Sequence, residues 1–128
     1  MNEIEIAWLA GLLEGEGTFY MRKGTGGKRH PCITVEMTDE DTIQKISAFF
    51  ERLTYKRARR FGRPTYSAMI MGGPAIYFMK MLRPYMMERR GKKIDEILLE
   101  CENKKFRRTV HENQVRSIRQ RHADGEVT

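Results

Sequence analysis

Residues 8–19, which read WLAGLLEGEGTF, decide the fold, because an apolar helix runs there straight into a strand. Ala7, Gly11 and Gly15 recur every four positions and form one stripe of small residues along a helix face. Glycine costs about 1 kcal/mol relative to alanine inside a helix, so the stripe predicts a compensating close approach of a second helix. A neighbouring face can pack into the chain's own core and consists of Ile6, Leu9, Leu12 and Leu13.

Glu16 stands where this helix is expected to end. In a two-fold pair of such helices the two copies of Glu16 would lie side by side, and paired carboxylates can hold a divalent cation. The stretch from Leu9 to Gly17, LAGLLEGEG, resembles the motif of the LAGLIDADG homing endonucleases. The motif occurs once, and the resemblance implies a homodimer with an interface formed by Ala7, Trp8, Gly11, Leu12 and Gly15.

The rest of the chain reads as two strands, a helix, two strands and further helices. The expected elements are a helix over 3–15, a strand over 17–23, a turn at 24–27, a strand over 32–37, a helix opened by a capping box of Thr38 and Asp41, strands over 54–61 and 65–71, a helix at Pro74 that Pro84 ends or kinks, and a helix from Lys92. The second helix is expected to have an apolar stripe of Ile43, Ile46, Phe50 and Leu53.

This order matches the αββαββα half-unit of the LAGLIDADG fold over about residues 3–105. The resemblance implies an α+β fold, with a saddle-shaped four-stranded antiparallel sheet that carries helices on one face. A short helical C-terminal tail would follow. The other face of the sheet would be free to enter a DNA major groove, which admits a two-stranded β-ribbon.

The resemblance also assigns candidate catalytic residues. Glu16 takes the position of the family's metal-binding acid and Gly15 belongs to the same metal site, which would use Mg²⁺ or another divalent cation such as Mn²⁺. Glu14 is expected to be a surface acid at the helix end. Asp39 falls where the family often places a residue that orders water, although an acid at a helix N-terminus also has a structural explanation.

A basic residue recurs in the family shortly after the proline that closes the helix following the last strand. Counting from Pro84, Arg89 takes this position, where many relatives carry lysine. Because arginine does not deprotonate, it would stabilise charge and would not act as a base. Lys92 is the second candidate, and a solvated basic helix end is the structural alternative.

The outward residues of the sheet are the predicted DNA-binding surface. Alternation over 17–23 and 32–37 turns Phe19 and Met21 inward and leaves Cys32 outward with the predicted contacts. Arginine can read guanine, whereas basic residues in a turn are expected to touch phosphate. The predicted contacts are Thr18, Tyr20 and Arg22 from the first strand, Lys28 and Arg29 from the turn, Thr34 and Glu36 from the second strand, and Arg57 and Arg59 from the basic segment 56–63. A merely solvated basic hairpin is the alternative for that segment.

The C-terminal segment has a different character from the rest of the chain. Between Lys104 and Arg121 there are seven basic residues and one acid, Glu112. Residues 110–125 resemble the first helix of helix-turn-helix modules fused to mobile endonucleases, although a frayed basic helix explains the pattern equally well. The sequence therefore predicts an endonuclease domain over 1–106 and a basic tail over 107–128, in part similar to a helix-turn-helix.

The composition favours a nucleic-acid partner. A net charge of +7 predicts a polyanionic binding partner, and the motif favours double-stranded DNA as that partner. No apolar run can span a bilayer and no signal-peptide pattern opens the chain. Cys32 and Cys101 lack metal-ligand spacing and are expected to be reduced thiols. An intracellular location in cytoplasm or an organelle matrix, with no secretion and no membrane partner, follows as the expectation.

Three functions compete. The first is a site-specific, metal-dependent double-strand DNA endonuclease that acts as a homodimer. The second is a catalytically inactive binder on the same fold, either an RNA maturase or a DNA-binding regulator. Glu16 favours the enzyme, because an inactive relative has no need of an acid there. A basic structural protein of nucleoid or ribosome leaves the motif unexplained.

Overall fold

In the computed structural model, helix α1 (Glu3–Glu16) passes into strand β1 (Gly17–Lys23) without a loop. The structure describes residues 1–123, apart from the side chains of Phe106 and His122. A capping box opens α1, in which Asn2 Oδ1 accepts from the Glu5 amide at 2.8 Å and Glu5 Oε1 accepts from the Asn2 amide at 3.1 Å. The amide of Gly17 closes the helix by donating to the Leu13 carbonyl.

The four strands form one antiparallel sheet in the order β1-β2-β4-β3. The remaining strands are β2 (Arg29–Met37), β3 (Tyr55–Arg57) and β4 (Thr65–Met71). One face of the sheet is apolar, and its buried residues are Phe19, Ile33, Val35, Ala68 and Ile70. This alternation of inward and outward residues in β1 and β2 confirms the face assignment made from the sequence.

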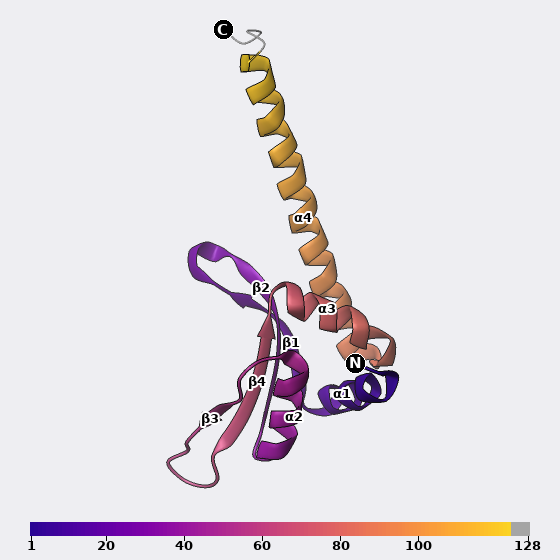
Figure 1. Ribbon diagram of the computed structural model, residues 1–128, viewed down its shortest axis with the longest axis vertical. Coiled ribbons are helices and arrows are strands. Elements are labelled where there is room, and N and C mark those ends of the chain that lie inside the picture. The colour runs from indigo at the N-terminus through magenta and orange to yellow at the C-terminus, as the bar shows by residue number, and fades with distance from the viewer. Residues whose placement is uncertain (124–128) are drawn as a thin grey trace. The chain divides into compact units, whose positions relative to one another are not determined.

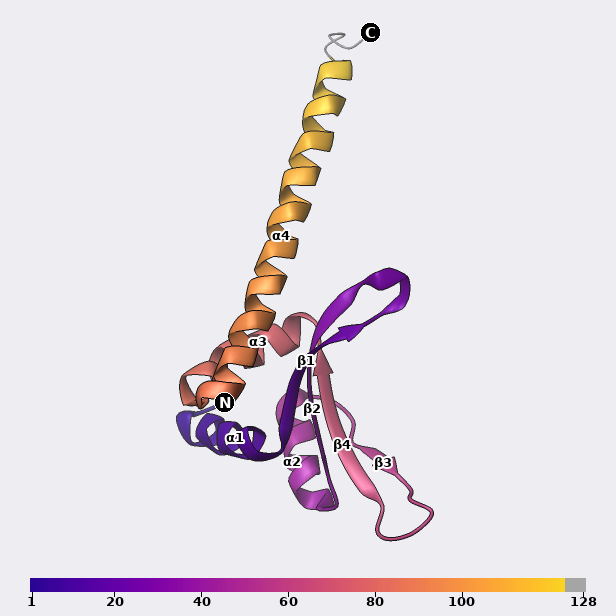
Figure 2. The same ribbon diagram turned by 180° about the vertical axis from the view of Figure 1, so that it is seen from behind.

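Helices cover the apolar face. These are α1, α2 (Glu40–Phe50), α3 (Gly73–Leu82) and the first turns of α4 (Glu88–Ala123), with a short 3₁₀ helix η2 (Arg83–Tyr85) after α3. Figures 1 and 2 show α1, α2 and α3 on the same side of the sheet. Their largest buried side chains are Leu9, Leu13, Ile43, Ile46, Phe50, Met79, Leu82, Ile94 and Ile97. Pro84 was expected to end or kink the third helix; the helix ends, since α3 stops at Leu82 and Pro84 lies in η2.

Some sequence expectations were wrong at element ends. Asp39, not Thr38, is the N-cap of α2, and its side chain makes no capping hydrogen bond, so there is no capping box. The Asp41 carboxylate instead accepts from the neighbouring Thr42 amide at 2.8 Å. Helix α2 ends at Phe50 because Glu51 adopts φ +54°, and Leu53 therefore lies outside the apolar stripe and is 78% exposed.

The strand expected over 54–61 is much shorter in the structure. β3 covers only Tyr55–Arg57, and the rest of the basic segment 56–63 lies in the loop that leads to β4. Gly62 in that loop has φ +89°, a conformation that a strand does not contain. β2 is longer than expected and begins at Arg29, after the 3₁₀ turn η1 (Thr25–Gly27). The last helix begins at Glu88, before the expected Lys92.

The chain divides into two units, one over Met1–Ile97 and a second that begins at Leu98. In the described part of the second unit, α4 continues unbroken to Ala123. Residues 124 and 125 of the helix-turn-helix-like stretch lie outside the described residues, and that assignment stays a prediction. None of the described helices combines the length and the apolar character that crossing a membrane requires.

Gly17→Ala is expected to destabilise the first unit. A Cβ at Gly17 would lie 2.8 Å from both the carbonyl oxygen and Cδ2 of Leu13, at the point where α1 becomes β1. Such overpacking costs about 1–3 kcal/mol. Thermal denaturation should show a lower melting temperature. Gly73→Ala is the matched control, because a Cβ there meets no atom of the described chain within 4 Å; equal stability of the two variants would contradict this account of Gly17.

Candidate functional site

The end of α1 presents the first candidate group. Glu16 is the last residue of the helix, and both it and Gly15 are exposed. Among the residues whose side chains the structure describes, no three His, Cys, Asp or Glu gather to form a metal site. One exposed carboxylate suits Mg²⁺, which is usually held by one or two protein carboxylates together with water and phosphate oxygens. The donor set therefore fits a divalent cation if further oxygen ligands come from outside the chain.

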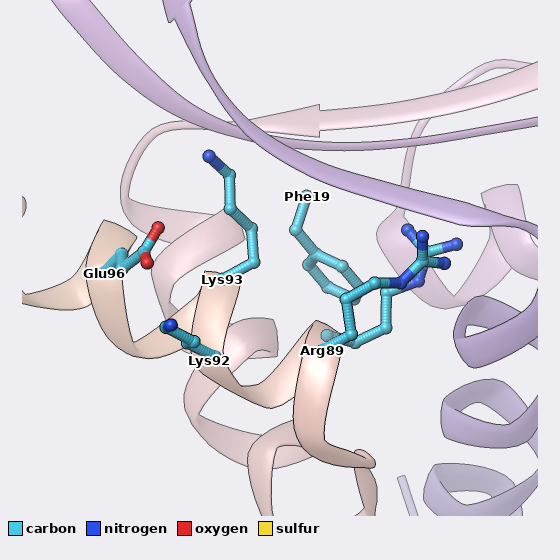
Figure 3. A pocket seen from close by; sticks show the side chains of 6 residues that line it. Phe19, Arg89, Lys92, Lys93 and Glu96 are labelled. Carbon is cyan, nitrogen blue, oxygen red and sulfur yellow. The ribbon is translucent and has the colours of Figure 1, made fainter.

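The first turns of α4 form a basic pocket against β1. The hollow has a volume of about 370 Å³ and is lined by Phe19, Arg89, Arg90, Lys92, Lys93 and Glu96. Phe19 points from β1 towards the helix that carries Arg89, Lys92 and Lys93 (Figure 3). Four cations and a single acid around one hollow create a positive potential that would attract a phosphate group. We call this hollow the basic pocket.

Hydrogen bonds connect the end of α1 to the beginning of α4. The Glu14 carboxylate accepts from the Met87 amide at 3.3 Å, and the Glu14 carbonyl accepts from Arg90 Nε at 3.2 Å. Glu14 is half-buried and is therefore more than the surface acid expected from the sequence.

Asp39 lies on a different element from Glu16 and from the residues of the basic pocket. It is exposed at the N-terminus of α2 and does not line the basic pocket. The structure thus brings Arg89 and Lys92 together and does not add Asp39 to them.

The open face of the sheet carries the residues predicted to contact DNA. The strand register aligns Thr18 with Thr34 and Met69, and Tyr20 with Cys32 and Met71. A shallow hollow of about 370 Å³ on this side is lined by Thr34, Val35, Glu36, Tyr55, Ser67, Ala68 and Met69. Its lining contains the polar side chains Thr34, Glu36, Tyr55 and Ser67, which can donate or accept hydrogen bonds.

The Arg22 guanidinium lies next to two methionine sulfur atoms on this face. Its Nη1 lies 3.7 Å from Sδ of Met69 and 3.6 Å from Sδ of Met71. Thioethers accept hydrogen bonds only weakly, so the guanidinium keeps its capacity for a stronger acceptor. Glu36 is exposed, and its carboxylate accepts a hydrogen bond from the Thr65 hydroxyl.

Cys32 shares this face but is fully buried, because Tyr20 and Met71 flank it in the register. Burial raises the pKa of the Cys32 thiol, and burial also raises the pKa of Tyr20. Both groups are therefore neutral at pH 7 and add no charge to the face.

The two hairpin loops extend the basic surface. Lys28 and Arg29 lie at the β1–β2 turn and Arg59 in the β3–β4 loop, and all are exposed. Arg57 shares the open face with its register partner Thr65. Figures 1 and 2 show the two loops at opposite ends of the sheet. A partner that follows the open face from end to end would meet both loops.

Several solved structures of homing endonucleases share this architecture. The homing endonuclease I-CvuI, in a complex with a DNA target and 2 mM Mg in which the DNA is not cleaved, has a TM-score of 0.58 and 18% identity over 76% of this chain and 65% of its own. The archaeal intron-encoded homing endonuclease I-Vdi141I, complexed with DNA, has a TM-score of 0.56 and 15% identity over 79% of this chain and 70% of its own. The LAGLIDADG meganuclease I-CpaMI, bound to uncleaved DNA, has a TM-score of 0.55 and 13% identity over 78% of this chain and 39% of its own.

The chain has the LAGLIDADG homing-endonuclease fold. It spans less than two thirds of the I-CvuI chain. The sequence matches no protein-family model and no curated protein.

The LAGLIDADG fold confirms the αββαββα half-unit expected from the sequence. Residues 9–17 lie where the motif is expected, at the end of the first helix and the start of the first strand. The stripe of the motif helix, made of Ala7, Gly11 and Gly15, is exposed, whereas Trp8 and Leu12 are half-buried. A Cβ at Gly11 or Gly15 would meet no atom of the described chain within 4 Å.

The Trp8 side chain of α1 contacts two residues of helix α2. Its ring meets Phe49 edge-on at 6.1 Å between centroids, and Lys45 Nζ lies 4.1 Å from its centroid. The first contact is an edge-to-face aromatic pair and the second is a cation–π interaction. Trp8 therefore has an intramolecular role at the edge of the stripe, in addition to the interface role that the sequence predicts.

Two further basic residues, Arg90 and Lys93, were not predicted from the sequence as candidate site residues. Both line the basic pocket with the predicted Arg89 and Lys92. Helical spacing offered a signal, because residues three and four apart share a helix face. The hydrogen bonds of Glu14 had no such signal, since they join residues 73 and 76 positions apart.

Proposed function

We propose that this chain is a site-specific, divalent-metal-dependent double-strand DNA endonuclease that acts as a homodimer. The observation that carries the proposal is the placement of Glu16 at the end of a LAGLIDADG motif helix, directly before a sheet whose open face carries polar side chains and two arginines, Arg22 and Arg57. The DNA bound to I-CvuI, I-Vdi141I and I-CpaMI supports the partner.

The roles of the residues follow from their chemistry. Glu16 and Gly15 would hold the divalent cation, which would activate water and neutralise the charge of the leaving oxygen. Arg89 and Lys92 would stabilise the charge of the scissile phosphate from the basic pocket. Asp39 is proposed to order water near the site.

Recognition is assigned to the open face and its loops. Arg22, Arg57 and the polar residues Thr18, Tyr20, Thr34 and Glu36 would meet base edges, and Lys28, Arg29 and Arg59 would meet phosphates. The stripe of Ala7, Gly11 and Gly15, with Trp8 and Leu12 at its edges, would pack against the same helix of a second copy. The division into a 1–106 nuclease domain and a 107–128 tail belongs to the same proposal.

The test is a cleavage-site selection on the purified chain. A library of randomised double-stranded DNA is incubated with Mg²⁺ or with EDTA, and the cut ends are sequenced. The proposal predicts one enriched target cut on both strands only when Mg²⁺ is present. Binding of a preferred DNA or RNA without cleavage would instead identify an inactive binder, a regulator or a maturase.

The basic face of the distal part of α4 is expected to add affinity without sequence choice. Lys105, Arg108, Arg116 and Arg119 share one side of the helix by their spacing, and all are exposed. Replacing all four by Gln should weaken DNA binding at low salt. The salt slope of log K should fall by about 0.9 for each phosphate that the helix no longer neutralises. The cut site should not change.

A titration of binding against salt concentration measures this effect. Charge-conserving exchanges at the same four positions, lysine for arginine and the reverse, are the control and should keep the parent's slope. An unchanged slope in the Gln variant, or cutting at a new sequence, would show that this helix face has another role.

A further inference from the structure

The end of α1 and the beginning of α4 are joined through a single acidic residue. Glu14 uses its carboxylate to accept from the Met87 amide at 3.3 Å, and its carbonyl accepts from Arg90 Nε at 3.2 Å. Glu14 and Arg90 are both half-buried. We call the three residues Glu14, Met87 and Arg90 the latch.

The hydrogen bonds of the latch provide partners for backbone groups at two helix ends, an amide at the start of α4 and a carbonyl at the end of α1. Met87 directly precedes α4, and the first amides of a helix have no intrahelical acceptor. The Glu14 carbonyl belongs to the last turn of α1, where carbonyls lack intrahelical donors. A carboxylate at a helix N-terminus and a guanidinium at a helix C-terminus both have favourable charge. Helix α1 has no basic residue in its own last turn, so Arg90 supplies that charge from another element.

The latch connects the two halves of the candidate site. Glu16 follows Glu14 by two residues at the end of α1, and Arg89 and Lys92 flank Arg90 on α4. Arg90 also lines the basic pocket. Any shift of α1 relative to α4 would change the separation between the Glu16 carboxylate and the cations of the pocket.

We propose that Glu14 is a positioning residue, which holds Glu16 in place relative to Arg89 and Lys92 by fastening α1 to α4. This inference rests on the proposed function of Glu16 and the basic pocket. The Glu14 side chain acts as the acceptor for the Met87 amide, and a neutral acceptor at this position should keep the two helices joined although the favourable charge is lost. This property separates a positioning residue from a metal ligand, which needs the charged carboxylate.

Glu14→Gln and Glu14→Ala test the proposal as a pair. The Gln amide oxygen can still accept from the Met87 amide, whereas Ala removes the acceptor. We expect Glu14→Ala to lower kcat by about tenfold or more, because a misplacement of about 1 Å can cost as much as 10²-fold. KM for the target should stay within about twofold, since the DNA-contacting face is untouched. Glu14→Gln should keep kcat within about threefold of the parent.

One control variant and one measurement that does not depend on cleavage complete the test. Glu3→Ala removes an exposed carboxylate from the other end of the same helix and should leave kcat unchanged. Hydrogen–deuterium exchange of the Met87 amide gives a readout without cleavage. It should accelerate in Glu14→Ala and stay at the parent's rate in Glu14→Gln.

Three results would overturn the proposal: equal loss of kcat in both variants, parent-like kcat in Glu14→Ala, or unchanged exchange of the Met87 amide in Glu14→Ala. Equal loss would indicate that the charge of Glu14 is used directly. A parent protein that cuts no DNA would contradict the proposed function by itself. In that case the Met87 exchange still decides whether the latch forms, so the two failures are distinguishable.

Discussion

Glu16→Gln is expected to abolish DNA cleavage while leaving DNA binding intact. The amide keeps the shape of the side chain and loses the charge that would hold Mg²⁺. Changes in residues that only support a metal ligand cost about 10–100-fold in affinity or activity, so loss of the ligand itself should exceed about 100-fold in cleavage rate. Glu16 is exposed at the end of α1 and is not part of the core, so the fold should be retained.

Cleavage assays at saturating protein, together with binding measured in Ca²⁺, check this prediction. Binding should persist or tighten slightly, because a carboxylate that repels phosphate has been neutralised. Glu3→Gln makes the same chemical change at the other end of α1 and should cut normally. Cleavage by Glu16→Gln near the parent's rate would exclude Glu16 as the metal ligand.

Gly11→Leu is expected to dissociate the proposed homodimer and to abolish cleavage with it. A Cβ at Gly11 meets no atom of the described chain within 4 Å, so the leucine fits a single copy. Leucine also favours a helix over glycine by close to 1 kcal/mol. The new side chain would instead fill the space that a second motif helix requires. Overpacking of about 1–3 kcal/mol corresponds to a dimer weaker by about 5- to 150-fold.

Sedimentation of the parent and the variant across a range of concentrations measures the dissociation constant. The melting temperature of the variant should equal or exceed that of the parent at concentrations where both are monomeric. Lys80→Leu introduces the same side chain at an exposed position of α3 and should not affect association. A dimer of parental strength in Gly11→Leu would place the interface elsewhere.

The sequence predicted those elements whose signals are local. The end of α1 and the bounds of β1 followed from the motif and from alternation, and β4 was placed over the residues it occupies. In each case the periodicity of side chains that face one core coincided with the element. The half-unit as a whole followed from the resemblance of residues 9–17 to a known motif.

Features that depend on tertiary context could not be predicted in this way. The left-handed conformation of Glu51, which ends α2 and leaves Leu53 exposed, has no signal in a non-glycine residue. β3 is limited to three residues because its segment has only one neighbouring strand and five basic side chains that repel one another. The burial of Cys32 on the open face requires knowledge of the strand register.

Only the residues of the candidate site that have a local signal in the sequence could be predicted. Glu16 belongs to a contiguous motif, and Arg89 could be counted from Pro84. The hydrogen bonds of Glu14 to Met87 and Arg90 depend on the packing of α1 against η2 and the start of α4. No spacing rule relates residues that meet only through the fold.

Cleavage of a plasmid that carries the selected target tests the central claim most directly. The parent and Glu16→Gln are compared in Mg²⁺ and in EDTA, and supercoiled, nicked and linear forms are quantified. The account predicts linear product from the parent in Mg²⁺, no product in EDTA, and no product from Glu16→Gln although it binds the target. Linear product in EDTA, or from Glu16→Gln at the parent's rate, would contradict it.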